Sequence, residues 1–223
     1  MNIKINYFDN QILLDDKINV IEIESKNYFY RFVHDLYSIY NLGYADDILF
    51  LENDQEKNMN GKIKVYINFF DFQFDSKKYI GDISKYVNEN IEEEDRVNLV
   101  NLYKKIINSY KRILNNIDLP LNIEEDITIE NLTKFVKITI NSNNELLDNL
   151  LLLIDLEKVL NTKNILFFVN LKQYLSKNEL IELYKYAIYN EVKIVLIDSQ
   201  SYGGTIEYEK KLIIDENLDE FVL

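Results

Sequence analysis

Cysteine is absent from this 223-residue chain, and histidine occurs once, as His34. The absence of cysteine excludes disulfide bonds, thiolate metal sites and a cysteine nucleophile. A single histidine excludes a histidine-rich metal site and any mechanism that needs several histidines. His34 lies off the apolar stripe of the helix expected around it, so we interpret it as a surface residue.

Glycine and proline are also scarce, with five and one copies, so long flexible linkers are not expected. The chain shows no N-terminal signal pattern and no apolar stretch of membrane-spanning length, which predicts a soluble cytoplasmic protein. It has no Gly-x-x-x-x-Gly-Lys-Ser/Thr loop and no Gly-x-Ser-x-Gly elbow. These absences argue against nucleoside-triphosphate hydrolysis and serine-hydrolase chemistry.

Hydrophobic residues make up 47% of the chain, enough for a sizeable core. The formal net charge is -13. Taken over the whole chain, this charge argues against nucleic acid, whose backbone is also anionic. The cations are unevenly distributed, however, so one face can still suit an anionic partner.

The clearest structural pattern is a strand, helix and strand near the C-terminus. Residues 164–170 and 193–199 are short apolar runs, typical of parallel strands covered on both faces. Between them, Ser176 and Glu179 form a capping box that predicts the start of a helix. This order predicts a right-handed parallel crossover and therefore an α/β fold. Its strands end in Asn170 and Asp198, at the sheet edge where ligands gather in such folds.

The remaining pattern predicts an α/β domain with a helical insertion. Alternating apolar residues and turn signals predict further strands before residue 76, with one helix between Ser25 and Gly43. The stretch from 76 to 160 is mostly helical, and a second capping box, Ser142-Asn-Asn-Glu145, is expected to start its last helix. We therefore predict three segments: 1–75, the first part of an α/β head; 76–160, a helical leg; and 161–223, the second part of the head.

One predicted helix of the leg has five cations and no acid between Arg96 and Asn116. Lys104, Lys105, Lys111 and Arg112 share a face, together with asparagines at helical spacing. Such a stripe matches the phosphates of a nucleic-acid duplex. Solvation of an ordinary amphipathic helix explains the same pattern, and from the residues alone it is the favoured explanation. The opposite face is expected to be core: Leu99, Leu102, Tyr103, Ile106, Tyr110, Ile113 and Leu114.

The loop that follows is rich in carboxylates, which suit a hard cation such as calcium. It lacks the spacing and the glycine of an EF-hand. The simpler interpretation is a solvated acidic loop in which Thr128 caps the next helix. The carboxylates are Asp118, Glu124, Glu125, Asp126 and Glu130.

Motifs along the whole chain resemble the small accessory adaptation protein of type II-A CRISPR systems, the Csn-two family. The resemblance rests on Asn164-Ile-Leu-Phe-Phe-Val-Asn170, Tyr174-Leu-Ser-Lys-Asn-Glu-Leu180 and Val192-Lys-Ile-Val-Leu-Ile-Asp198. Asp198 stands where the family more often has glutamate. The stretch Leu119-Pro-Leu-Asn-Ile-Glu-Glu-Asp126 also looks like this family, although the middle of the chain matches loosely.

The resemblance implies a RecA-like head, related to phosphate-loop ATPases but without the loop, and a helical leg. It implies homotetrameric rings that bind ends of double-stranded DNA in a positively lined hole, with calcium between head and leg. The implied partners are the spacer-integrase complex and the effector nuclease, with which the protein acts during spacer acquisition. The resemblance implies no enzymatic activity for the protein itself. The family's acidic loop aligns with Glu124, Glu125 and Asp126, whereas Asp118 and Glu130 do not align cleanly.

Two classes of function therefore remain open. The first is a non-catalytic ring on DNA ends, with Lys104, Lys105, Lys111 and Arg112 as its DNA contacts. The alternative is a metal-dependent nuclease or nucleotidase that uses strand-edge carboxylates, Asp198 with Asp71 or Asp75. Product formation from duplex DNA with magnesium or manganese separates the two.

Overall fold

The computed structural model describes residues 1–70, 76–123, 128, 131–132, 136, 138–141 and 143–223, and the side chains of 76–78 are not included. The chain divides into two compact units. Unit 1 contains Met1–Phe72 and Asn143–Leu223, and unit 2 contains Gln73–Ser142. Unit 2 is therefore inserted in the sequence of unit 1, and each unit is described by itself below.

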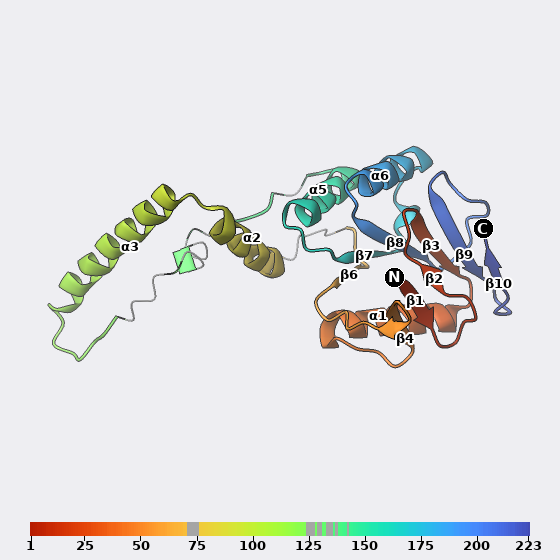
Figure 1. Cartoon of the computed structure of the whole chain (residues 1–223), viewed down its shortest axis with the longest axis horizontal. Helices are drawn as coiled ribbons and strands as arrows, with labels where there is room; N and C mark the ends of the chain where they lie inside the picture. The colour runs from red at the N-terminus through yellow and green to blue at the C-terminus, as the bar shows by residue number, and fades with distance from the viewer. Residues whose placement is uncertain (71–75, 124–127, 129–130, 133–135, 137, 142) are drawn as a thin grey trace. The chain divides into compact units, whose positions relative to one another are not determined.

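Unit 1 is built on a six-stranded sheet in which only the edge strand β10 is antiparallel to its neighbour. In spatial order the strands are β10 (Glu220–Val222), β9 (Glu209–Ile214), β3 (Ile18–Ile23), β8 (Lys193–Asp198), β7 (Ile165–Val169) and β6 (Ile63–Tyr66). The helices α5 and α6 cover one face of this sheet, and α1 lies on the other (Figure 1). The predicted α/β class is confirmed.

The predicted crossover near the C-terminus is also confirmed. The strand β7 is followed by the short helix η1 (Leu171–Gln173), the helix α6 (Lys177–Tyr189) and then β8, which pairs with β7 in parallel. The capping box is complete: Glu179 N donates to Ser176 Oγ at 3.4 Å, and Ser176 N donates to Glu179 Oε2 at 2.7 Å. Both bonds satisfy amides that a helix start otherwise leaves without partners.

The other face of the sheet packs on α1 (Lys26–Leu42) and on a small antiparallel sheet. The order of the small sheet is β2 (Ile12–Leu13), β1 (Asn2–Ile5), β4 (Ile48–Glu52) and β5 (Gln55–Glu56). Alternate residues of β1 and β4 enter the core, which fits the period of a strand. The helix α1 ends at Gly43, whose φ of 89° is a left-handed conformation that favours glycine.

The helix α5 (Leu146–Val159) belongs to unit 1, whereas the predicted leg extended to residue 160. Its buried Glu157 lies 2.7 Å from Lys64 of β6, so a buried ion pair fixes it to the sheet. The helix also begins later than the box at Ser142 predicts. It starts after Glu145, and the Asn149 side chain bonds the backbone of Asn143 and Glu145; Ser142 itself lies outside the described residues.

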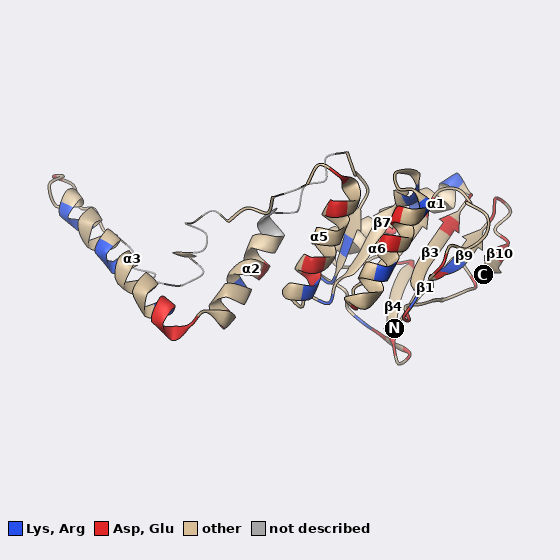
Figure 2. Cartoon of the chain, turned by 90° about the horizontal axis from the view of Figure 1, so that it is seen from above, with Lys and Arg blue, Asp and Glu red and all other residues tan. Residues whose placement is uncertain are grey.

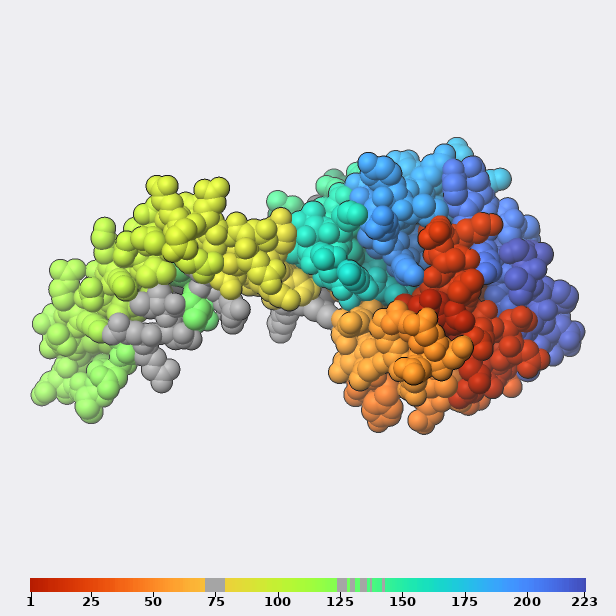
Figure 3. Space-filling view, viewed as in Figure 1, coloured from red at the N-terminus to blue at the C-terminus, as the bar shows by residue number. Residues whose placement is uncertain are grey.

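Residues from the two ends of the sequence lie side by side in unit 1. The space-filling view shows the red N-terminal segment against the blue C-terminal one (Figure 3). Glu220 of β10 accepts hydrogen bonds from the backbone amides of Asp9 and Asn10 at 2.6 and 2.8 Å. A carboxylate bound by two amides holds the first turn of the chain to the edge of the large sheet.

The described part of unit 2 consists mainly of two helices, α2 (Ser76–Asn90) and α3 (Glu93–Leu114). Arg96 fixes the corner between them, because its guanidinium donates to Asn88 O at 2.7 Å and to Asn88 Oδ1 at 3.1 Å. Across the described ranges of both units, the helices are too short or too polar to span a bilayer.

Candidate nucleic-acid interface

The charges of α3 are sorted along its axis. Its first turn carries Glu93, Glu94 and Asp95, and its last turn carries Lys111 and Arg112. Figure 2 shows the acidic turn in red and the cations in blue further along the helix. Acids at the N-terminus and bases at the C-terminus both complement the helix macrodipole, so the sequence stabilises this long helix by local electrostatics.

The four predicted DNA contacts all lie on the surface of α3. Lys104, Lys105, Lys111 and Arg112 are exposed. Lys104 and Lys111 are seven residues apart, which places them on one face about 10 Å from each other along the axis. Within the described ranges, neither Lys104 nor Lys105 forms an ion pair. Their charges are therefore available to an anionic partner.

The apolar face of α3 is not a core in the described structure, contrary to the sequence-based expectation. Leu102 is 55% exposed and Ile113 58%, and Leu99, Ile106 and Tyr110 are exposed too. On this helix only Ile107 is buried. A helix buries its apolar stripe only against another element, and among the described residues no helix or strand packs closely along α3.

The predicted calcium ligands Glu124, Glu125 and Asp126 lie outside the described residues, as does Glu130. Asp118 is described and exposed. Thr128 Oγ1 accepts a hydrogen bond from Asn131 N at 3.2 Å, the geometry of the expected helix cap. Across the ranges described on either side of this loop, no three carboxylate or imidazole groups are placed to hold a metal ion.

A buried ion cluster lies on the α6 side of the large sheet, and sequence reasoning missed most of it. We call it the strand-edge ion cluster: Glu22 of β3, Lys172 of η1, Asp198 of β8, and Glu209 and Lys211 of β9. Each of these side chains is more than nine-tenths buried. Charged residues inside apolar strands, such as Glu22 and Lys211, were the sequence signal for it.

Ion pairs connect four of the five residues. Lys172 Nζ lies 2.7 Å from Glu209 Oε1 and 3.5 Å from Glu22 Oε1, and Lys211 Nζ lies 2.8 Å from Glu22 Oε1. The contacts of Lys172 are ion pairs without hydrogen-bond geometry. Tyr184 of α6 donates a hydrogen bond to Glu209 Oε1 at 2.8 Å. Burial raises the pKa of Tyr184 far above its ordinary value, so this hydroxyl stays protonated.

Asp198 is the fifth member and differs from the others. Neither of its carboxylate oxygens has a hydrogen-bond partner among the described residues. Burial raises its pKa from 3.8 to about 7, against the opposing effect of Lys172. The other carboxylates of the nuclease hypothesis, Asp71 and Asp75, lie outside the described residues. A fully buried Asp198 beside two ammonium groups is poorly placed to bind magnesium and substrate.

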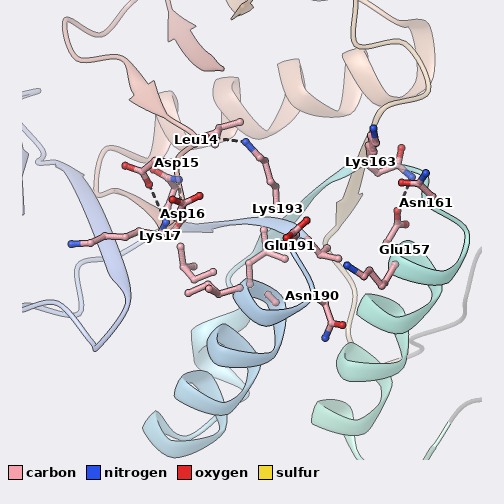
Figure 4. Close-up of a pocket in the computed structure, with 18 residues that line it drawn as sticks. Leu14, Asp15, Asp16, Lys17, Glu157, Asn161, Lys163, Asn190, Glu191 and Lys193 are labelled. Atoms are coloured by element: carbon pink, nitrogen blue, oxygen red, sulfur yellow. Dashed lines mark hydrogen bonds between the residues drawn. The ribbon is translucent and has the colours of Figure 1, made fainter.

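A cavity of about 530 Å³ lies at the opposite, amino-terminal edge of the large sheet. It is lined by the turn before β3 and by the segments that follow α5 and α6 (Figure 4). Lys193 points to the backbone of Leu14, whose carbonyl accepts its hydrogen bond at 2.9 Å. Lys17 and Lys163 alternate with Asp15 and Glu191 around it, so this cavity does not present the single positive sign that phosphates require.

The fold and these sites define the structural class of the protein. It is an α/β domain with a mostly parallel sheet, and it carries an inserted helical unit with an exposed cationic stripe. The family model described as "CRISPR-associated protein (Cas_Csn2)" matches residues 43–218, and the chain belongs to this family. The predicted family is thereby confirmed, and with it a CRISPR-associated role in adaptation.

A solved structure agrees with this assignment at the level of the fold. The crystal structure of Stu0660 of Streptococcus thermophilus is similar with a TM-score of 0.62 and 12% sequence identity. The alignment covers 100% of this chain and 76% of that chain. No curated protein matches the sequence.

Proposed function

We propose that the protein is a non-catalytic ring that binds the ends of double-stranded DNA during CRISPR spacer acquisition in the cytoplasm. The observation that carries this proposal is the exposed stripe of Lys104, Lys105, Lys111 and Arg112 on α3. A row of cations along a rigid helix meets successive phosphates without reading bases, so the binding is independent of sequence.

The apolar face of α3 supports the ring. A soluble monomer rarely leaves a long row of large apolar side chains in water, and such rows commonly bind other protein surfaces. Leu102, Ile106 and Ile113 form this row on the side opposite the cations. In the proposed homotetramer this face meets other copies of the chain, while the cationic face lines the hole that receives DNA.

Calcium is the proposed cofactor, with Glu124, Glu125 and Asp126 as ligands. Carboxylate oxygens are the ligands that this hard cation prefers. The net charge of -13 per chain adds a second reason, because four such chains repel one another unless cations reduce that charge. The role proposed for calcium is therefore to hold the acidic loop and to stabilise the assembly.

For unit 1 we propose a RecA-like head without the phosphate loop. The strand-edge ion cluster supports a non-catalytic role, because its lysines are paired with Glu22 and Glu209 and Asp198 is buried. Ion pairs among Glu22, Lys172, Glu209 and Lys211 therefore neutralise four of the five charged groups at this edge of the sheet. The proposed partners are the spacer-integrase complex and the effector nuclease, which supply the chemistry.

The test compares DNA substrates of equal length and sequence. Linear duplex is expected to bind with an affinity that falls steeply as salt rises, whereas closed circular duplex binds poorly because it offers no end to a preformed ring. Equal affinity for the two forms contradicts the ring. Incubation of labelled duplex with magnesium or manganese tests the nuclease alternative, and any cleavage product contradicts the non-catalytic role.

A further inference from the structure

The loop of residues 199–208 is held over the strand-edge ion cluster by the cluster itself. Glu22 Oε2 accepts hydrogen bonds from Ser201 Oγ at 3.0 Å and Tyr202 N at 3.3 Å. Lys211 Nζ donates to the carbonyls of Gly203 and Gly204 at 2.9 and 3.0 Å. Cluster side chains therefore do two things at once: they pair with each other and they fix the loop.

Two further contacts complete the attachment of the loop. Ile206 N donates to Glu209 Oε2 at 2.9 Å, and the Tyr202 ring lies 5.7 Å from Lys172 Nζ. At the start of the loop, Ser199 N donates to Asn170 Oδ1 at 2.8 Å. The loop itself remains at the surface, since residues 202–205 are exposed. Cluster side chains therefore hold a loop whose outer residues are in contact with solvent.

The charge of the cluster depends on one proton. Two lysines face two glutamates, so the cluster is balanced when Asp198 is protonated, and Tyr184 from α6 adds no charge. When Asp198 ionises, the buried cluster has one net negative charge, and that carboxylate has no hydrogen-bond partner among the described residues. An uncompensated buried charge is costly and is relieved by contact with water.

We propose that Asp198 is a buried proton-binding site that latches the 199–208 loop over the sheet edge when protonated and releases it when ionised. The loop begins at Ser199, directly after Asp198, and we expect its opening to bring water to this carboxylate. Release also exposes Lys172 and Lys211 at the carboxyl edge of the sheet. The latch does not depend on the proposed DNA function.

The burial-raised pKa of Asp198, about 7, places the transition near neutral pH. Selective ¹⁵N-glycine labelling measures it directly, because the chain has only five glycines and two of them are the carbonyl partners of Lys211. The amide resonances of Gly203 and Gly204 are expected to move together between about pH 5 and 9, with a midpoint near neutral pH. Gly43 and Gly61 lie away from the loop and serve as internal references.

Variants assign the midpoint to Asp198. In Asp198→Asn the transition is expected to disappear, with both glycines held in the low-pH position. In Lys172→Gln the loop is expected to be held less tightly at low pH, because two glutamates then face one lysine. The remaining transition moves to higher pH, because Lys172 lowers the pKa of Asp198. Glu207→Gln, which alters an exposed carboxylate of the same loop, and His34→Gln, which removes the only histidine, both keep the wild-type midpoint.

Three results contradict the latch. The first is the absence of a transition at Gly203 and Gly204 in the wild-type protein. This result does not depend on whether any variant folds. The second is an unchanged midpoint in Asp198→Asn, and the third is a transition that disappears in His34→Gln. Should Asp198→Asn not fold, the wild-type titration and the direction of the Lys172→Gln shift decide the question.

Discussion

Glu157 is the residue that attaches α5 to the large sheet. Its carboxylate pairs with Lys64 Nζ at 2.7 Å and accepts hydrogen bonds from Asn164 at 2.9 Å and from Thr162, and both charged side chains are almost completely buried. Because Glu157→Ala breaks a buried ion pair and leaves the Lys64 charge buried without this carboxylate, it is expected to destabilise the fold by about 3–5 kcal/mol. Urea denaturation followed by circular dichroism measures this change.

Glu52 offers the matched control for that experiment. It pairs with Lys57 at a similar distance, 2.6 Å, but at the surface. Glu52→Ala removes an ion pair of the same type without leaving a buried charge, so the denaturation midpoint is expected to stay close to that of the wild type. An equal loss of stability in the two variants shows that burial is not the cause.

Asp198 gives a second prediction at the residue scale, on stability against pH. Its folded pKa of about 7 lies above the ordinary value of 3.8, so the folded protein keeps a proton that the unfolded chain releases. The stability that this proton contributes is complete below the unfolded pKa and is lost as pH rises through the folded one. Asp198→Asn removes this dependence. At pH 8 its free energy of unfolding is therefore expected to exceed that of the wild type by at most about 4 kcal/mol. If the free energy of unfolding changes by the same amount between acidic and alkaline pH in both proteins, this prediction is wrong.

The cationic face of α3 is tested at the scale of the element. Lys104→Glu with Lys111→Glu reverses two charges on one helix face and leaves the apolar residues unchanged. Binding of a short linear duplex is expected to fall at least about tenfold, and the slope of affinity against salt to decrease by about two, one for each lost phosphate contact. The measurement pairs fluorescence anisotropy with molecular mass, which is expected to stay constant.

A control with the same charge change uses unit 1. Lys26→Glu with Lys177→Glu alters two exposed lysines in the first turns of α1 and α6. Duplex affinity is expected to stay near the wild-type value in this variant. Loss of affinity in both double variants means that net charge alone governs binding. Unchanged affinity in the α3 variant moves the interface to another part of the chain.

Local signals explain how far the elements were predictable from the sequence. The crossover from β7 to β8 was predicted because its capping box and apolar runs act within a few residues. The strand-edge ion cluster was not, since Glu22 meets Lys172 and Lys211 from 150 or more positions away. The placement of α5 was missed for a similar reason: composition groups it with the helices before it, whereas Lys64 determines where it packs.

At the scale of the whole molecule, the exposed apolar row of α3 leads to a prediction about assembly. Leu102→Ser with Ile113→Ser makes that row polar, and the proposed ring is expected to dissociate to smaller species in analytical ultracentrifugation. Leu42→Ser with Tyr189→Ser changes two exposed apolar residues of unit 1 and serves as the control. A mass that falls only in the control, or in neither variant, contradicts the role of α3.

Calcium removal is the second prediction at this scale. An ion that binds only the folded protein stabilises it by about 2.7 kcal/mol at a concentration one hundred times its Kd. Chelation is therefore expected to lower the melting temperature by about 5–10 °C or to dissociate the assembly. Glu124→Gln with Glu125→Gln and Asp126→Asn abolishes this response. Asp15→Asn with Asp16→Asn and Glu191→Gln, an equal charge change elsewhere, retains it.

The strand order of unit 1 also has a consequence for the order of events during synthesis. The strand β3 is made early, but both of its neighbours in the sheet, β8 and β9, are among the last strands to leave the ribosome. The apolar side chains of β3 therefore have no sheet partners while all of unit 2 is translated. Pairings so distant in sequence form slowly and leave nascent strands open to aggregation. Unit 2 comes from one continuous stretch of the sequence, so in this protein the inserted unit is free to fold before the unit that encloses it.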